Sequence, residues 1–242
     1  EGQRIMAYGD YDVDGAASVA LIQEFLHNNG FDVLPYIPDR YSEGYGLSKE
    51  GVRIAATSQC KIIITLDCGI RAVERVAEAK ALGIDVIICD HHLPGSAMPE
   101  AHTILNPKQP DCPYPFKELS GCGVAFRLTQ ALTERFGLSP MSAYDGLDLV
   151  ALSIASDLVE VTGENRVLLH HGLRTIARNA RPGIRALLNV VRCTPDYLTV
   201  RDIISRISPR INAAGRMSRA TEAVDLLTAR NEQRAGELAL NL

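Results

Sequence analysis

Residues 4–18 read RIMAYGDYDVDGAAS, and this stretch indicates how the chain begins to fold. Its apolar start, Arg4–Tyr8, predicts a buried β-strand. An apolar stripe over Ala16–Asn28 predicts a helix soon after that strand. The short turn between these two elements carries three acids: Asp10, Asp12 and Asp14.

The first hundred residues repeat this alternation of strand and helix. Further predicted strands are Asp32–Ile37, Lys61–Leu66, Asp85–Cys89 and a short Thr103–Leu105. The predicted helices between them are Ser48–Thr57 and Ala72–Leu82. Strands that alternate with helices and are apolar along nearly their whole length form parallel sheets covered on both faces. We therefore predict an α/β fold over about residues 1–106, with a mostly parallel sheet and helices on both of its faces.

A proline-rich stretch over residues 107–115 leads into a second part with helical patterns only. The predicted helices are Gly123–Phe136, Leu147–Ser156, Asn165–Asn179, Gly183–Val191, Val200–Arg206 and a last helix that begins at Thr221 and runs to the end. Pro209 is expected to separate helices, because proline has no backbone N–H to donate. We expect one domain over residues 1–220, with a helical part over about 116–220, and a connector helix over 221–242 that leads to a further domain.

Composition narrows the class of protein. Hydrophobic residues make up 46% of the chain and charged residues 22%, which is ordinary for a globular protein. No apolar run approaches the ~18 residues that a membrane span needs, so we expect no membrane contact. The six cysteines form no CxxC pair. We expect them to be buried, reduced thiols of a cytoplasmic protein, not disulfides or zinc ligands.

Charge is distributed unevenly along the chain. The formal net charge is −4, which by itself argues against a nucleic-acid partner. Between Arg166 and Arg219, however, eleven arginines stand against two acids, so this segment carries +9 and the remainder −13. Arginine forks bind phosphate oxygens bidentately, so such a segment suits a phosphate polymer. The alternative is a set of solvated helix faces whose arginines pair with acids elsewhere.

Acids and histidines follow several of the predicted apolar segments. Asp67 follows the strand Lys61–Leu66, and Asp157 lies at the end of a predicted helix. Asp90, His91 and His92 follow the strand Asp85–Cys89. In an open parallel sheet, ligands bind outside the carboxyl ends of the strands, so the acid-bearing turns should meet in one crevice.

Carboxylates gathered in one crevice repel one another unless cations neutralise them. Oxygen ligands with one or two imidazoles suit Mn²⁺ or Mg²⁺ better than a thiolate-seeking metal. Each motif alone has a simpler interpretation, as a helix cap, a calcium loop or a surface turn. Their joint occurrence at three strand ends instead predicts a site for two ions.

Several short motifs and four longer stretches of the sequence resemble those of a known family. The run DHH at 90–92, with DxD at 12–14, TLDCG at 65–69 and SDLVE at 156–160, resembles the DHH phosphoesterase superfamily. Within it, the chain is similar to the RecJ-type single-strand-specific DNA exonucleases. The stretches that carry this resemblance are YGDYDVDGAAS at 8–18, PDRYSEGYGLS at 38–48, SGCGVAFRL at 120–128 and RISPRINAAGRM at 206–217.

The resemblance implies a role for each site residue. Asp12 would hold one metal, and Asp14, His91 and Asp157 the other, with Asp67 as the bridge. His92 would contact the scissile phosphate and Asp90 would orient the imidazoles from outside the ligand shell. The residues implied to bind DNA phosphates are Arg40, Arg210, Asn212 and Arg216.

One position departs from the superfamily pattern. Tyr8 stands where a histidine often precedes the first Asp of DxD by four residues. A phenol is a poor ligand at neutral pH, so the first metal would either recruit Asp10 or bind more weakly.

The resemblance implies a metal-dependent exonuclease that digests single-stranded DNA in the 5′→3′ direction, in DNA repair and recombination. It further implies single-stranded DNA as the partner, with a single-strand-binding protein and a helicase nearby, and a monomer. Two alternatives remain. One is a phosphatase or phosphodiesterase of the same superfamily that cleaves pyrophosphate, nanoRNA or a cyclic dinucleotide. The other is a non-catalytic replication scaffold.

Overall fold

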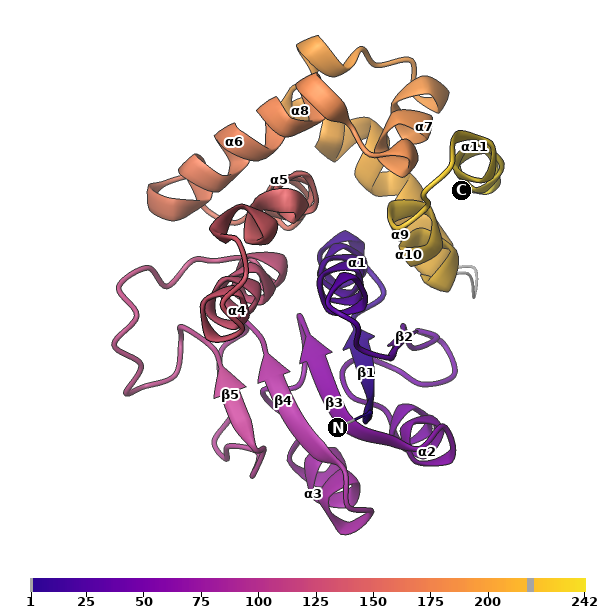
Figure 1. The fold of residues 1–242 in the computed structure, drawn as a ribbon. Coiled ribbons are helices and arrows are strands. Elements are labelled where there is room, and N and C mark those ends of the chain that lie inside the picture. Colours follow the sequence, from indigo (N-terminus) through magenta and orange to yellow (C-terminus); the bar gives the residue numbers. More distant parts are fainter. Residues whose placement is uncertain (1, 217–219) are drawn as a thin grey trace.

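A single five-stranded sheet forms the first part of the molecule (Figure 1). The computed structural model describes residues 2–216 and 220–242, the side chains of 215, 216 and 220 excepted. The strands are β1 (Arg4–Gly9), β2 (Val33–Tyr36), β3 (Cys60–Leu66), β4 (Asp85–Cys89) and β5 (Thr103–Leu105). They pair in the order β2-β1-β3-β4-β5, and every pair is parallel. The predicted parallel sheet is therefore confirmed.

Helices cover both faces of the sheet, as the apolar strands predicted. Side chains along a strand alternate between faces, so in β1 Ile5 and Ala7 join one apolar cluster while Met6 and Tyr8 join another. The first cluster contains α1 (Val13–Asn28) and α4 (Gly121–Arg135). The second contains α2 (Lys49–Thr57) and α3 (Val73–Ala81).

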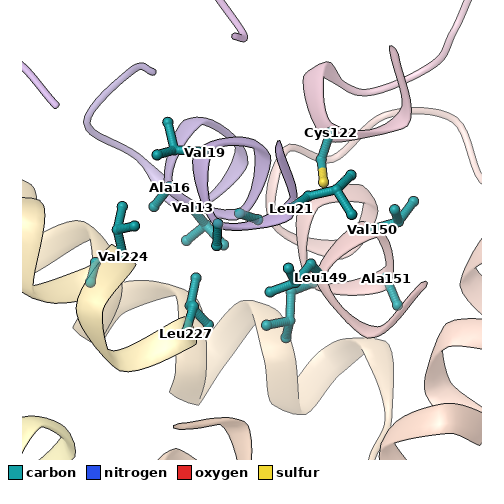
Figure 2. Packing of buried hydrophobic residues seen from close by; sticks show 14 of the residues in the cluster. Val13, Ala16, Val19, Leu21, Cys122, Leu149, Val150, Ala151, Val224 and Leu227 are labelled. Carbon is teal, nitrogen blue, oxygen red and sulfur yellow. The ribbon is translucent and has the colours of Figure 1, made fainter. Parts of the chain in front are cut away.

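The remaining helices pack over α1 and α4 and leave α1 between two layers (Figure 1). They are α5 (Leu147–Ser156), α6 (Gly163–Asn179), α7 (Pro182–Val190), α8 (Val200–Asp202), α9 (Ser208–Arg216), α10 (Ala220–Leu227) and α11 (Glu232–Asn241). Figure 2 shows the apolar contact: Val13 and Ala16 of α1 face Val224 and Leu227 of α10 across the core. Because α1 is covered on both sides, the first ten residues of this helix are all buried.

A buried arginine fastens this helical layer to α1. Arg181 Nε lies 2.6 Å from Asp148 Oδ2, and its Nη1 lies 2.7 Å from Glu24 Oε2. Nη1 also donates to the carbonyl of Leu227. A guanidinium with all these acceptors keeps its charge despite burial, and it joins α1, α5 and α10 at one point.

Two predictions about the helical part are wrong. The last helix is not continuous: α10 ends at Leu227, and α11 starts afresh at Glu232, where Asn231 caps it by accepting from the N–H of Arg234. Pro209 does not separate helices, because a π-helical turn (η3, Ile203–Ile207) widens the helix just before it. The 3₁₀ turns η1 (Pro140–Gly146) and η2 (Pro195–Tyr197) were not predicted. The connector role of residues 221–242 stays a prediction.

Two predictions from composition can be compared directly with the structure. The six cysteines are all free, as expected, but only four of them are buried, because Cys112 and Cys193 are half-buried. None of the helices in the described ranges has the length and apolar character required to span a bilayer.

Candidate metal centre

The acid-bearing turns meet at the carboxyl ends of β1, β3 and β4, next to the end of α5. Three groups of side chains each bring their ligand atoms within 4.8 Å of one another. They are Asp10, Asp12 and Asp67; Asp14, His91 and Asp157; and Asp67, His91 and His92. All the residues predicted as metal ligands therefore lie in one cluster, although they come from four separate parts of the chain.

His91 lies at the centre of one half of this cluster. Its Nε2 is 3.1 Å from Asp67 Oδ1, 3.6 Å from Asp157 Oδ2 and 3.8 Å from Asp14 Oδ2. Asp67 belongs to the group with Asp10 and Asp12 and to the group with His91 and His92. Its carboxylate is thus shared by two groups of candidate ligand atoms, as the predicted bridging role would require.

Tyr8 takes no part in the cluster. Its buried hydroxyl donates to the carbonyl of Gly46 at 2.8 Å and accepts from the N–H of Ser48 at 3.0 Å. Asp10 instead shares a group with Asp12 and Asp67. The geometry therefore favours the alternative in which Asp10 replaces the ligand that Tyr8 cannot supply.

Several polar atoms of the cluster have no hydrogen-bond partner although they are buried. They include Asp10 Oδ1, Asp67 Oδ1 and both ring nitrogens of His91. Burial, followed by the charge of Asp12, raises the pKa of Asp10 to about 7. Burial, followed by the charge of Asp14, likewise raises the pKa of Asp157 to about 7. Unpartnered ligand atoms and mutually repelling acids are what a divalent cation would satisfy, so the donor set fits Mn²⁺ or Mg²⁺.

The amino terminus of α4 holds Asp14 in place. Asp14 Oδ2 accepts from the N–H of Gly121 and Oδ1 from the N–H of Cys122, both at 2.7 Å. Ser153 of α5 donates to the same carboxylate at 2.7 Å. The first N–H groups of a helix have no intrahelical acceptor, and the helix dipole favours an anion there. Sequence analysis missed these contacts, although Ser120 followed by Gly-Cys-Gly is a recognisable helix start.

Asp67 is held in a rarely populated backbone conformation. Its φ of +61° lies in the left-handed region, which asparagine and aspartate tolerate better than most residues. Gly121 packs directly against it, because a Cβ there would lie 2.6 Å from the Cβ of Asp67. The bridging carboxylate is therefore positioned by its own backbone and by a glycine more than fifty residues away.

Asp90 accepts hydrogen bonds on both of its oxygens, as Asp14 does, but it belongs to none of the three groups of ligand atoms found among the described residues. Oδ2 accepts from the N–H of Ile70, and Oδ1 accepts from the backbone N–H groups of His91 and His92. Oδ1 also lies 2.8 Å from His92 Nδ1. Burial alone would raise the pKa of Asp90, but these hydrogen bonds outweigh it and lower the pKa. The side chain orients the ring of His92 but contacts only the backbone of His91.

His92 is half-exposed at the edge of the cluster. Its hydrogen bond to Asp90 raises its pKa, which favours the cationic form. The hydroxyl of Tyr45 lies 3.3 Å from the ring nitrogens. The partly exposed ring of His92 at the edge of the cluster would be accessible to a phosphate.

The residues predicted to bind DNA have different surroundings. Arg40 is exposed and its guanidinium lies 4.9 Å from the ring centroid of Tyr11. Arg210 is half-buried, and the side chain of Arg216 lies outside the described residues. Asn212 Oδ1 accepts from the N–H of Val13 at 3.1 Å, a contact that the sequence did not indicate.

A family model and several known proteins match this chain. Residues 4–154 match the model of the DHH family, N-terminal domain. The single-stranded-DNA-specific exonuclease RecJ of Salmonella typhimurium is 42% identical over the whole chain, and that of Bacillus subtilis is 40% identical over 99% of it. The chain spans 44% and 30% of these two relatives, respectively.

Solved structures extend the comparison to three dimensions. The crystal structure of an exonuclease RecJ bound to manganese superposes with a TM-score of 0.90 at 35% identity, covering 99% of this chain and 60% of that one. RecJ from Thermus thermophilus in complex with Mn²⁺ gives a TM-score of 0.85 at 34% identity, covering 99% of this chain and 34% of that one. Because the family model matches the whole sheet and more than half of the sequence, the chain belongs to the DHH family.

Proposed function

We propose that this chain is the catalytic part of a divalent-metal-dependent exonuclease that hydrolyses phosphodiester bonds in single-stranded DNA in the 5′→3′ direction. One observation carries the proposal: two sets of ligand atoms share Asp67 in a fold that superposes on manganese-bound RecJ along nearly the whole chain.

The metal ions would be held by the cluster around Asp67, with Asp10 and Asp12 on one side and Asp14, His91 and Asp157 on the other. When bound, such ions act as Lewis acids toward a phosphoryl group and make a nucleophile of water at neutral pH. The carboxylates must be ionised to bind them. The raised pKa of Asp10 and Asp157 therefore makes occupancy depend on pH near neutrality.

His92 is the side chain that would contact the scissile phosphate. Its ring is oriented by Asp90 Oδ1, 2.8 Å from Nδ1, and its raised pKa keeps it protonated over a wider pH range. A cationic donor at a phosphate oxygen stabilises charge that develops there during hydrolysis. Asp90 is a positioning residue in this scheme, because it orients the ring of His92 and belongs to none of the three groups of ligand atoms found among the described residues.

A polymeric substrate is supported by the arginine-rich segment between Arg166 and Arg219. Arg166, Arg174 and Arg178 of α6 are exposed, and within the described part of the chain they have no acidic partner. Arg40 and Arg210 are the proposed phosphate contacts nearer the cluster. We further infer a cytoplasmic monomer in DNA repair and recombination that works beside a single-strand-binding protein and a helicase.

The experiment supplies 5′-labelled single-stranded DNA, the matching duplex and pyrophosphate, each with Mn²⁺, Mg²⁺ or chelator. Asp67→Ala should abolish cleavage and metal binding together. Asp85→Ala is the matched control, since Asp85 is an exposed acid at the opposite end of the same sheet. Release of 5′-terminal mononucleotides from single strands alone supports the proposal. Cleavage of pyrophosphate without cleavage of DNA would assign the chain to the small-substrate alternative.

A further inference from the structure

One helical segment contacts residues that are adjacent to both halves of the cluster, and it supplies none of the proposed ligands. Residues 200–216 form α8, the π turn η3 and α9 in direct succession. Proline at 209 cannot donate a backbone hydrogen bond, and the widened turn accommodates this loss. In that turn the N–H and the hydroxyl of Ser208 both bond to the carbonyl of Ile203.

The π turn determines which side chains of α9 face the cluster. Ile203, Ile207 and Ile211 are completely buried and fix one side of the segment in the core. Ser208 and Asn212 are four residues apart, so they lie one above the other on the neighbouring side. The extra residue in the π turn changes the direction in which all the following side chains of the helix point. The alignment of Ser208 and Asn212 therefore depends on η3.

Both aligned side chains bond to residues adjacent to proposed ligands. Ser208 Oγ lies 2.7 Å from the Oγ of Ser156, the residue before Asp157. Asn212 Oδ1 accepts from the N–H of Val13, the residue between Asp12 and Asp14. One face of one helix thus spans the two segments that carry opposite halves of the ligand set.

The bond from Val13 has a direct consequence for Asp12. Val13 begins α1, so its N–H has no acceptor within the helix. Asp12 Oδ1 already accepts from Gly15 N at 3.0 Å. Without Asn212, the N–H of Val13 would be left unsatisfied or would compete for the carboxylate of Asp12. Asn212 therefore leaves that carboxylate available for an ion.

We propose that α9 sets the geometry of the metal centre, with Asn212 and Ser208 as positioning residues for Asp12 and Asp157. This inference rests on the proposed function only in taking the cluster to be a metal site. It assigns Asn212 a role that is distinct from contact with a DNA phosphate. As a positioning residue, Asn212 must accept a hydrogen bond from Val13, whereas contact with a phosphate oxygen requires a donor. Substitutions can therefore separate the two roles.

The test measures Mn²⁺ affinity by calorimetry and by electron paramagnetic resonance, in the absence of DNA. Asn212→Leu removes the acceptor at similar volume and should weaken Mn²⁺ binding by about 10–100-fold, the range typical of residues that orient ligands. Asn212→Asp keeps an acceptor for Val13 and should retain wild-type affinity or exceed it. The same Asp variant should repel DNA phosphates if Asn212 also contacts them. Fluorescence anisotropy with labelled oligonucleotides in Ca²⁺ measures that effect separately.

Ser205→Ala is the matched control for Ser208→Ala. Ser205 lies on the same segment, but its hydroxyl bonds only to the carbonyl of Arg201 within the helix. Ser208→Ala and Ser156→Ala should each weaken Mn²⁺ binding, and the double variant should weaken it no further than either one. Circular dichroism and thermal melting in chelator identify any variant that fails to fold, and the Asn212→Asp variant remains informative in that case.

Wild-type Mn²⁺ affinity in Asn212→Leu, or equal losses in the Leu and Asp variants, would overturn the inference. These titrations contain no DNA, so they test the metal centre independently of nuclease activity. An inactive wild-type protein would contradict the proposed function but would not affect the result for Asn212 and Ser208.

Discussion

Replacing Gly121 by alanine tests the bridging role of Asp67 through a residue that is not itself a ligand. Gly121 is the first residue of α4, and its backbone suits any amino acid. An added Cβ would lie 2.6 Å from the Cβ of Asp67 and 2.7 Å from its Oδ1. Carbon atoms in contact lie about 3.5–4.0 Å apart, so Asp67 or α4 must move by about 1 Å.

A displacement of that size is large for a metal ligand. Functional groups need placement within about 0.5 Å, and a 1 Å error can cost about 100-fold in turnover. Overpacking costs about 1–3 kcal/mol of stability, which a domain of typical stability can lose and still fold. We therefore expect Gly121→Ala to fold, to bind Mn²⁺ more weakly and to lose about 100-fold in the rate of DNA cleavage.

Gly123→Ala provides the control on the same helix. The nearest atoms to its added Cβ are Ser120 Oγ at 3.3 Å and two carbons of Leu119 at 3.4 Å, which need give way only slightly. Calorimetry with Mn²⁺, single-turnover cleavage of labelled single strands and thermal melting in chelator would be measured for both variants. If Gly121→Ala binds Mn²⁺ and cleaves DNA as well as Gly123→Ala does, the positioning of Asp67 by α4 is wrong.

Three further predictions concern other parts of the site. His92→Ala should keep Mn²⁺ affinity and lose turnover, whereas His91→Ala should lose affinity for one ion; equal losses of affinity in calorimetry would contradict this division. Arg210→Ala should flatten the log–log salt dependence of oligonucleotide binding by about 0.7, the value for one phosphate contact on single strands, and an unchanged slope in anisotropy would exclude the contact. Burial raises the pKa of Asp10 and Asp157 to about 7. Their protonated forms therefore stabilise the metal-free protein below pH ~4, and this stabilisation is lost as the pH rises through 7. Since Mn²⁺ binds the ionised carboxylates, it should raise the melting temperature more at pH 8 than at pH 6, and an equal rise would contradict the shifted pKa values.

The strands and the gathering of the acids at one edge of the sheet could be predicted because both depend on short-range patterns. β3 and β4 are apolar runs in which most residues are buried, and such runs are recognisable without knowledge of their neighbours. Asp67 and Asp90 follow them directly. Once the strands are taken as parallel, these acids must meet at one edge of the sheet. The prediction therefore needed no long-range contact to be known in advance.

The helical part was harder to predict because tertiary contacts decide its details. Pro209 normally ends a helix, but here the π turn before it and the buried isoleucines on one face keep the segment helical. The break before α11 depends on Asn231 as a cap within an otherwise apolar pattern. The contact from Asn212 to Val13 joins residues 199 positions apart, and no local pattern indicates it.

The hydrogen-bonding of the acids also explains why three adjacent residues, Asp90, His91 and His92, have different roles. Both oxygens of Asp90 accept from protein donors, and among the described residues this carboxylate belongs to no group of candidate ligand atoms. Both ring nitrogens of His91 are buried and unpartnered, so this side chain is costly unless an ion binds it. His92 is tied to Asp90 on one side and half-exposed on the other, so it is oriented but accessible. Protein donors thus orient Asp90 and Asp14, while the unsatisfied buried atoms of the described cluster lie on the proposed ligands Asp10, Asp67 and His91. Because the sheet and its two apolar clusters account for the packing without those atoms, the metal-free protein should fold with its ligand residues already near their binding positions.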